Sequence, residues 1–407
     1  MTPIDRSHPV YPVHPPLAPE AVRDAMDGVL RPNPGDSERE ETWLASPVPQ
    51  SHAANLLELA NGDLACVWFA GSQEGRGDVC IFFARLKKGS RRWSEPVRLT
   101  DDMERSEQNP FLFSVPDGRL WLVYTSQIAG DQATALVKYR ISEDNGETFG
   151  PVGVLFDEPG TFVRHPIVVN GAGEWLLPVF LCRAAPGKRW RGHNDTSAVM
   201  ISRDAGKNWR RVEVRGSLGA VHMDIVPLQD DQYIAAYRSR FADSIKRSIS
   251  RDGGHSWTAP EPTDLPNNNS SIQMIKLQSG RLAIVYNHIS AADSTERRAG
   301  LYDEIEAHGN EDLPPPGQPP AIWGTPRAPM TIALSEDGGR TFPIHRDIET
   351  GDGNCLSNNS AELRNREFSY PTICQGSDGT INVAFTYYRQ AIKHVRFSEE
   401  WVLAAGS

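Results

Sequence analysis

Apolar and polar positions along the chain repeat one unit. Each unit has an apolar run, a turn containing Gly, Asn or Asp, and a second apolar run, as in LLELANGDLACVWF from Leu56. Such residues around such a turn are typical of a β-hairpin, because Gly, Asn and Asp tolerate the positive φ angles that the turn needs. The units begin at Leu56, Phe111, Ile167, Ile225, Met274 and Thr372.

A second pattern, Ser-x-Asp-x-Gly-x-x-aromatic, alternates with the hairpins. It occurs as SEDNGETF from Ser142, SRDAGKNW from Ser202, SRDGGHSW from Ser250 and SEDGGRTF from Ser335, and a degenerate copy, RLKKGSRRW, ends at Trp93. In such a turn the Asp accepts backbone N–H bonds, the Gly adopts the left-handed conformation and the aromatic ring packs beneath. We therefore assign these turns a structural role.

The two patterns together predict an all-β fold, a six-bladed β-propeller with four antiparallel strands in each blade. We expect residues 47–407 to form the propeller, with insertions at about 289–325 and 346–366 that lie over one mouth. Residues 1–46 are Pro-rich. They are expected to form an arm outside the propeller, with a short helix over 20–30.

The repeated turn is the Asp box, and from Ser51 to Phe397 the chain resembles the sialidase-like (neuraminidase, BNR repeat) β-propeller superfamily. The resemblance implies an enzyme that acts on glycans. It also implies chemistry without a metal or other cofactor.

Composition excludes several other classes of protein. The chain has 42 basic and 52 acidic side chains, and the net charge of -10 argues against a nucleic-acid partner. Its five cysteines show no CxxC spacing, which argues against a disulfide framework or a zinc-thiolate site. No signal-peptide core and no apolar run of membrane-spanning length occurs, so we expect a cytoplasmic protein without a membrane partner. The oligomeric state stays open.

The first residues of the innermost strands of a propeller meet at one end of its central channel. Three histidines precede apolar strands in this way, and their spread around a channel favours contact with substrate over ligation of one metal ion. Aligning the six hairpins places these polar residues at the channel mouth: His52, Asn109, His165, His222, Asn268, Ser270 and Tyr370.

The resemblance to sialidases assigns roles to particular residues. It implies that Tyr370 is the nucleophile, that Asp78 is the acid/base, and that Arg238 and Arg327 bind a substrate carboxylate, for which the planar guanidinium is suited.

Two positions depart from the family pattern. His222 or Asp224 stands where sialidases have the glutamate that activates the tyrosine, and His52 replaces their first arginine. Arg240, Arg164 and Arg183 are candidates to compensate for that arginine.

Three functions remain open for this set of residues. The first is an exo-glycosidase that cleaves a terminal acidic sugar through a tyrosine nucleophile. The second is a uronate-specific lyase, in which a histidine base and a tyrosine acid act beside cations that neutralise the carboxylate. The third is a carbohydrate-binding propeller without catalysis, in which Trp190, Trp323 and the NNNSS run contact sugar rings. Each implies a carbohydrate partner, and we expect it to carry a carboxylate.

Overall fold

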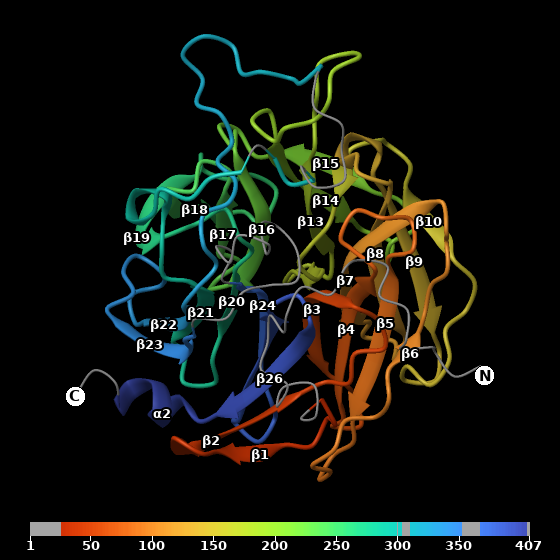
Figure 1. The fold of residues 1–407 in the computed structure, drawn as a ribbon, viewed down its shortest axis with the longest axis vertical. Coiled ribbons are helices and arrows are strands. Elements are labelled where there is room, and N and C mark those ends of the chain that lie inside the picture. The colour runs from red at the N-terminus through yellow and green to blue at the C-terminus, as the bar shows by residue number, and fades with distance from the viewer. Residues whose placement is uncertain (1–25, 299, 303–309, 352–366, 405–407) are drawn as a thin grey trace.

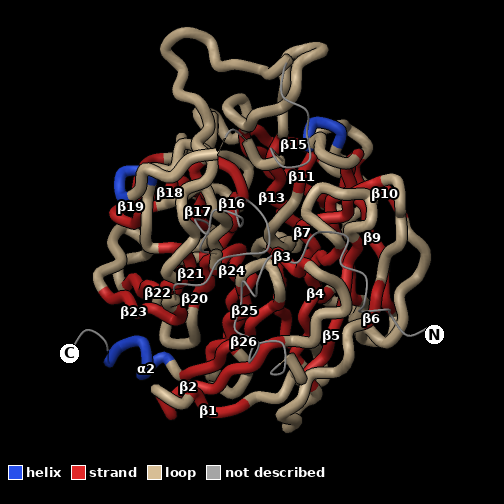
Figure 2. The backbone as a smooth tube through the Cα atoms, viewed as in Figure 1, coloured by secondary structure: helices blue, strands red, loops and turns tan. Residues whose placement is uncertain are grey.

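The computed structural model describes residues 26–298, 300–302, 310–351 and 367–404. These residues form strands and loops with very little helix (Figure 2). Six sheets are arranged in a ring around a central axis (Figure 1), which confirms the predicted six-bladed propeller with four-stranded antiparallel blades.

The first three blades follow one another along the chain. Blade 1 contains β3 (Gln50–Glu58), β4 (Leu64–Gly71), β5 (Cys80–Leu86) and β6 (Val97–Arg98). Blade 2 contains β7 (Arg105–Ser114), β8 (Leu120–Ile128), β9 (Leu136–Ser142) and β10 (Gly153–Phe156). In blade 3 the innermost position is shared by β11 (Thr161–Phe162) and β12 (Val168–Val169), followed by β13 (Trp175–Leu181), β14 (Thr196–Ser202) and β15 (Arg210–Glu213).

The other three blades complete the ring. Blade 4 contains β16 (Ala220–Pro227), β17 (Tyr233–Ser239), β18 (Ser244–Ser250) and β19 (Glu261–Pro266). Blade 5 contains β20 (Gln273–Lys276), β21 (Leu282–Asn287), β22 (Met330–Ser335) and β23 (Ile344–Glu349). Blade 6 contains β24 (Phe368–Gln375), β25 (Ile381–Tyr387) and β26 (Ala391–Phe397), and the short helix α2 (Glu399–Leu403) follows it.

The sixth blade takes its outer strands from the other end of the chain. β2 (Asp36–Trp43) pairs with β26, and β1 (Arg31–Asn33) pairs with β2, so the first and last colours of Figure 1 lie side by side. Residues 31–43 therefore belong to blade 6, whereas the sequence analysis placed them in an arm outside the propeller. Most of the helix expected over 20–30 lies outside the described residues, and residues 26–30 are not helical.

Both predicted patterns have the expected local structure. The six hairpins are the first two strands of the six blades. The Asp boxes join the third strand to the fourth: in blade 4, Ser250 Oγ accepts from the Gly254 N–H, and Asp252 accepts from the Ser256 N–H at 2.9 Å. Gly254 has a φ of +93° in this turn, as the left-handed position requires.

Neighbouring blades are joined through one position on their inner strands. Thr372 Oγ1 accepts from the Leu56 backbone N–H of the next blade at 3.0 Å. Because a buried N–H without a partner is costly, these bonds fix the inner strands against one another. Three further blades do the same: Asn55 accepts from Leu112, Asp224 from Met274 and Gln273 from Ile373.

A long insertion separates β21 from β22, and its described residues, 288–298, 300–302 and 310–329, lie over one mouth of the ring. Its Tyr302 hydroxyl accepts from the Gln127 side chain of blade 2 at 3.0 Å, and its Glu311 forms a β-bridge with Arg189 of blade 3. The insertion therefore reaches from blade 5 to blades 2 and 3. The second insertion begins later than expected, because β23 extends to Glu349, and residues 352–366 lie outside the described part. No helix among the described residues is long and apolar enough to cross a membrane.

Candidate active site

Hairpin register identifies the residues that the six blades place at equivalent positions on the axis. Each inner strand ends at a residue paired across its turn, such as Glu58 with Leu64 or Gln375 with Ile381. The residue five positions earlier is, from blade 1 to blade 6, Ala53, Asn109, Arg164, His222, Ser271 and Tyr370. The sequence alignment put His52 and His165 there, one residue away from Ala53 and Arg164.

A β-bulge with an unusual backbone conformation occurs at four of these positions. The φ angles are +57° at Ala53, +49° at Asn109, +52° at His222 and +51° at Tyr370. Each lies inside a register shift of its inner strand. Side chains other than glycine rarely adopt this region, and such strain is concentrated at functional sites. The bulges change the direction of the side chains at the channel mouth.

Arg164 crosses the axis and bonds to the backbone of two other blades. Its guanidinium donates to the carbonyls of Ala54 at 3.1 Å, Tyr370 at 3.2 Å and Pro371 at 3.0 Å. Its Nε also donates to Ser271 Oγ at 3.1 Å. Burial lowers the pKa of Arg164 to about 10. With its donors used in this way, Arg164 holds blades together and is not free to bind a substrate carboxylate.

Tyr370 lies at the centre of a cluster of arginines. The Arg238 guanidinium donates to the Tyr370 hydroxyl oxygen at 2.6 Å. The guanidinium carbons of Arg164, Arg238 and Arg327 lie 5.5, 5.6 and 5.4 Å from the centre of the Tyr370 ring. Cations at these distances are attracted to the face of an aromatic ring. The His52 ring completes the cluster, with its centroid 4.2 Å from that of Tyr370.

His222 shares Arg238 with Tyr370. The same Arg238 nitrogen lies 3.5 Å from His222 Nε2, and His222 Nδ1 lies 3.0 Å from Ser271 Oγ. Since arginine only donates, we assign the tautomer in which Nε2 is unprotonated and Nδ1 carries the hydrogen. Burial and the charge of Arg238 lower the pKa of His222 well below its usual range, so the ring is neutral. Burial and Arg389 do the same to the pKa of His52.

Two carboxylates that the sequence analysis did not select hold the arginines in place. Glu367 accepts from Arg327 and from Arg389, each at 2.8 Å, and Arg389 also pairs with Glu74. Burial alone would raise the pKa of Glu367, but Arg389 and Arg327 outweigh burial and lower it to about 2. Glu367 stands three residues before Tyr370, and its place at the start of the last inner strand was the only signal for it in the sequence.

Arg240 is held by a separate set of contacts. Its guanidinium pairs with the fully buried Asp195 at 2.7 Å and lies beside two indole rings that contact each other, 5.2 Å from Trp190 and 5.1 Å from Trp323. Trp323 belongs to the insertion, so Arg240 fastens the insertion to blades 3 and 4. Trp190 and Trp323 thus pack on Arg240.

The remaining predicted residues have contacts outside the Tyr370 cluster. Asp78 accepts from the N–H and the hydroxyl of Ser72, on the loop that also carries Glu74. Asp224 bonds to the Met274 N–H and lies 3.7 Å from His165, and burial raises its pKa to about 7. Arg183 is half-exposed and lies 3.6 Å from Glu158. Asn109 is buried at the blade 2 bulge. The Asn268 amide donates to the Pro326 carbonyl, and Ser270 is fully buried beside it.

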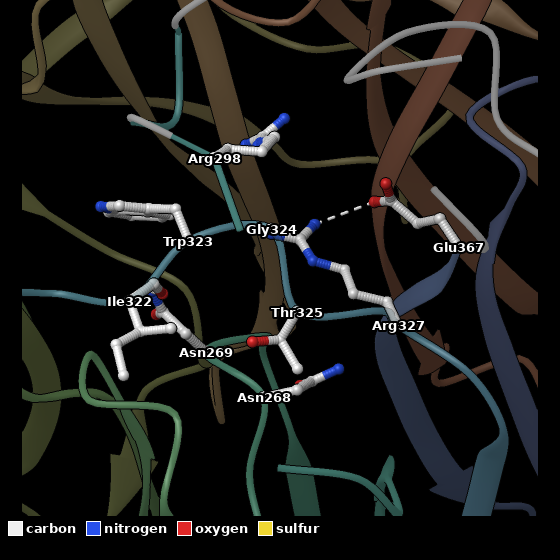
Figure 3. Close-up of a pocket in the computed structure, with 9 residues that line it drawn as sticks. All are labelled: Asn268, Asn269, Arg298, Ile322, Trp323, Gly324, Thr325, Arg327 and Glu367. Atoms are coloured by element: carbon white, nitrogen blue, oxygen red, sulfur yellow. Dashed lines mark hydrogen bonds and ion pairs between the residues drawn. The ribbon is translucent and has the colours of Figure 1, made fainter. Parts of the chain in front are cut away.

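A narrow pocket opens beside the cluster, under the insertion. Figure 3 shows Arg327 pointing toward Glu367, with Arg298 and Trp323 on the far side of Gly324. Its walls are Asn268, Asn269, Arg298, Ile322, Trp323, Gly324, Thr325, Arg327 and Glu367. Asn269 also accepts from Arg238 at 2.7 Å, which connects the pocket wall to the Tyr370 cluster. In the described residues, no three His, Cys, Asp or Glu side chains are placed to hold a metal ion.

Residues 62–383 match the family described as the BNR repeat-like domain. A Hadza microbial sialidase, Hz136, superposes with a TM-score of 0.64 at 12% identity, over 87% of this chain and 66% of that one. An intramolecular trans-sialidase from Ruminococcus gnavus, in complex with oseltamivir carboxylate, gives 0.62 at 13% identity, over 86% of this chain and 95% of that one. A leech intramolecular trans-sialidase gives 0.63 at 12% identity, over 88% and 69%. No curated protein matches the chain by sequence. The structural likeness at these identities is a likeness of fold.

Proposed function

Since the chain belongs to the BNR repeat-like family, we propose that it is a sialidase-like glycosidase that removes a terminal acidic sugar. The observation that carries the proposal is the bond from Arg238 to the Tyr370 hydroxyl, with three guanidinium groups around the ring. A tyrosine held by arginines beside a small pocket suits a reaction at the end of a glycan. The neighbour from Ruminococcus gnavus, which is bound to oseltamivir carboxylate, supports an acidic ligand.

The proposed reaction has two steps. Tyr370 Oη forms a bond to the anomeric carbon while the bond to the leaving oxygen breaks, and Asp78 donates the proton that this oxygen takes up. The Tyr370 proton passes to the unprotonated Nε2 of His222, which bonds the same Arg238 nitrogen. Water then attacks the anomeric carbon, releases Tyr370 and gives one proton back to Asp78, while Tyr370 recovers its proton from His222.

We favour His222 over Asp224 as the partner of Tyr370. Asp224 belongs to the series of side chains that accept a backbone N–H from the next blade, together with Asn55, Gln273 and Thr372. A carboxylate engaged in this way maintains the ring. Asp78 accepts from Ser72, and as the acid it would exchange this partner for the leaving oxygen.

A specific observation also favours a second candidate, a uronate lyase. Among the described residues, the hydrogen-bond partner of the Tyr370 hydroxyl is an arginine and not a carboxylate. In β-elimination, neutral His222 would take the proton beside the carboxylate, Arg238 and Arg327 would stabilise the enediolate, and Tyr370 would protonate the leaving oxygen as the double bond forms.

One screen separates these reactions. The protein is incubated with 4-methylumbelliferyl sialosides and uronides and with uronate oligosaccharides, and both fluorescence and ultraviolet absorbance are recorded. Hydrolysis releases the fluorophore without a new ultraviolet band, whereas elimination produces an unsaturated, absorbing sugar.

The variant Tyr370→Phe tests the assignment of the nucleophile. We expect its turnover to fall by about 1,000-fold or more, since loss of a nucleophile removes the covalent route. The matched control is Tyr139→Phe, because Tyr139 lies on β9 and stacks on Trp121 far along blade 2. If the Tyr370→Phe variant turned over substrate as fast as the wild-type protein, the mechanism would be wrong. If the wild-type protein bound the oligosaccharides but turned none of them over, a carbohydrate-binding protein would be favoured.

A further inference from the structure

Ser271 is buried at the axis and contacts both a histidine and an arginine of the Tyr370 cluster. It is the axial residue of blade 5, so it follows His222 of blade 4 and precedes Tyr370 of blade 6 around the ring. Its hydroxyl oxygen lies 3.1 Å from Arg164 Nε and 3.0 Å from His222 Nδ1. Ser271 therefore connects the arginine that crosses the axis to the histidine beside Tyr370.

Both neighbours of Ser271 present a donor to its oxygen. Since arginine only donates, Arg164 Nε–H uses one of the two lone pairs of the hydroxyl oxygen. At the other end of the imidazole ring, Arg238 faces Nε2 with a donor, so the ring hydrogen of His222 lies on Nδ1. The second lone pair of Ser271 Oγ then accepts from this Nδ1–H.

The contact at Nδ1 is the stronger of the two polar contacts of the His222 ring. Its length of 3.0 Å is that of an ordinary hydrogen bond, whereas Nε2 lies 3.5 Å from the Arg238 nitrogen. His222 is buried, and a buried N–H that loses its acceptor costs free energy. Loss of the Ser271 hydroxyl should therefore weaken the preference for a hydrogen on Nδ1.

A hydroxyl group takes the place that a carboxylate has in many histidine-dependent enzymes. In the Ser-His-Asp triad an aspartate accepts from Nδ1–H and so orients the histidine base. Among the described residues, no carboxylate bonds to the His222 ring. Asp224, two residues further along β16, accepts from the Met274 N–H and faces His165. The orienting group of His222 is therefore the neutral side chain of Ser271.

We propose that Ser271 is a positioning residue, which keeps the hydrogen of His222 on Nδ1 and leaves Nε2 to take the proton of Tyr370. The inference rests on the proposed function for the role of His222 as proton acceptor. It applies equally to the lyase, in which the same nitrogen takes the proton beside the carboxylate. Once His222 is protonated both ring nitrogens donate, and Nδ1 keeps its bond to Ser271. The serine therefore holds the ring in one orientation before and after the proton moves.

The tautomer of His222 can be measured without a substrate. Histidines are labelled with nitrogen-15, and long-range proton–nitrogen NMR spectra distinguish a ring nitrogen that carries a hydrogen from one that does not. The His222 signals are identified by their absence from the His222→Gln variant. We expect the hydrogen on Nδ1 in the wild-type protein. Ser271→Ala should lower the ratio of the Nδ1–H to the Nε2–H tautomer by about 10-fold, which is the size of the effect of one hydrogen bond.

Two matched variants accompany Ser271→Ala. Ser271→Thr keeps the hydroxyl and should keep the tautomer. Ser248→Ala makes the same change at another buried serine, on β18, and should alter neither the His222 signals nor turnover. Melting temperatures show which variants are folded. If Ser271→Ala does not fold, Ser271→Cys replaces it, because a thiol is a weak acceptor.

Kinetics connect the tautomer to the reaction. The substrate is whichever 4-methylumbelliferyl sialoside, uronide or uronate oligosaccharide the wild-type protein converts. We expect Ser271→Ala to lower kcat by about 10-fold, in proportion to the tautomer ratio. KM should stay unchanged, because Ser271 is not among the residues that line the pocket.

The outcomes separate this inference from the proposed function. A hydrogen on Nε2 in the wild-type protein, or an unchanged tautomer in folded Ser271→Ala, would overturn the inference. Wild-type kcat in a Ser271→Ala variant whose tautomer has changed would also overturn it. If the tautomer changes as expected but the wild-type protein converts none of the substrates, Ser271 orients His222 as inferred and the proposed function is wrong.

Discussion

Arg164 and Arg238 are buried arginines beside one tyrosine, and their acceptors give them different roles. Arg164 donates to backbone carbonyls of blades 1 and 6, which fixes the position of the Tyr370 backbone. Arg238 donates to side chains, Tyr370 and Asn269, which a ligand can displace. Burial lowers the pKa of Arg238 to about 9, so the guanidinium still carries its charge at neutral pH.

We expect Arg164→Lys to slow turnover more than it weakens substrate binding. Lysine keeps the charge but has a single nitrogen, so it cannot reach the Ala54, Tyr370 and Pro371 carbonyls together. We expect kcat to fall by about 100-fold with a smaller change in KM, because displacement of a reacting group by about 1 Å has effects of that size. Steady-state kinetics and urea unfolding measure the two effects.

Arg183→Lys is the matched control for Arg164→Lys, because the Arg183 side chain is half-exposed and lies 3.6 Å from Glu158. Wild-type kcat in Arg164→Lys would contradict a positioning role. A lower unfolding free energy with unchanged kcat would assign Arg164 to stability alone.

Residue identities at the axis could be predicted from the sequence more readily than their register. The sequence identified Tyr370, Arg238 and Arg327 through a family resemblance, and the structure places these three within one cluster. It aligned His52 and His165 instead of Ala53 and Arg164, because neither the bulge at Ala53 nor the break between β11 and β12 around Arg164 leaves a mark in the apolar pattern. Arg164 could not be recognised as the residue that joins the blades, since its partners are backbone carbonyls, which every residue possesses.

At the scale of elements, the hairpins and Asp boxes were predictable because they are local. Their turns are determined by residues a few positions apart, and Ser250, Asp252 and Gly254 bond as the pattern indicates. β2 was not predicted, because DSEREETW is polar and its partner β26 lies at the other end of the chain. Neither the hairpin pattern nor the Asp-box pattern extends to a strand that is paired only by closure of the ring.

The Asp-box glycines combine backbone conformation with close packing, and a matched pair of substitutions separates the two. Gly254 has a φ of +93° and a Cβ there would lie 2.5 Å from Leu176. Gly280, in the hairpin turn of blade 5, has a φ of +90° and nothing within 4 Å. We expect Gly280→Ala to lower the unfolding free energy by about 1 kcal/mol from backbone strain, and Gly254→Ala by about 3 kcal/mol because the clash is added.

Urea unfolding of the two glycine variants measures this difference. Equal losses of unfolding free energy would mean that Leu176 moves aside without cost, and that the Asp box requires glycine only for its left-handed conformation.

At the scale of the whole molecule, a propeller must join its last blade to its first, and here the N-terminal strand does so. β2 forms four residue pairs with β26, from Glu40 with Arg396 to Trp43 with Lys393. Lys393 is buried, and its ammonium lies 3.1 Å from Glu41 and 4.6 Å from the Trp43 ring. The edge of β26 is therefore covered only while β2 is in place. β2 also supplies Glu41, one of two carboxylates that pair with the buried Lys393, the other being Glu349 of β23.

A chain that begins at Leu44 should accordingly lose much more stability than one that begins at Met26. Removal of β2 breaks the ladder to β26, and four backbone bonds at about 1 kcal/mol each give a loss of about 4 kcal/mol before Lys393 is considered. The exposed edge of β26 should also promote association, because unpaired strand edges bind other strands. Thermal unfolding and light scattering of the two truncations measure both effects. Equal melting temperatures for the two truncations would mean that β24, β25 and β26 close the ring without β2. The bonds between inner strands, such as that from the Leu56 N–H to Thr372 Oγ1, would then be sufficient to join blade 6 to blade 1.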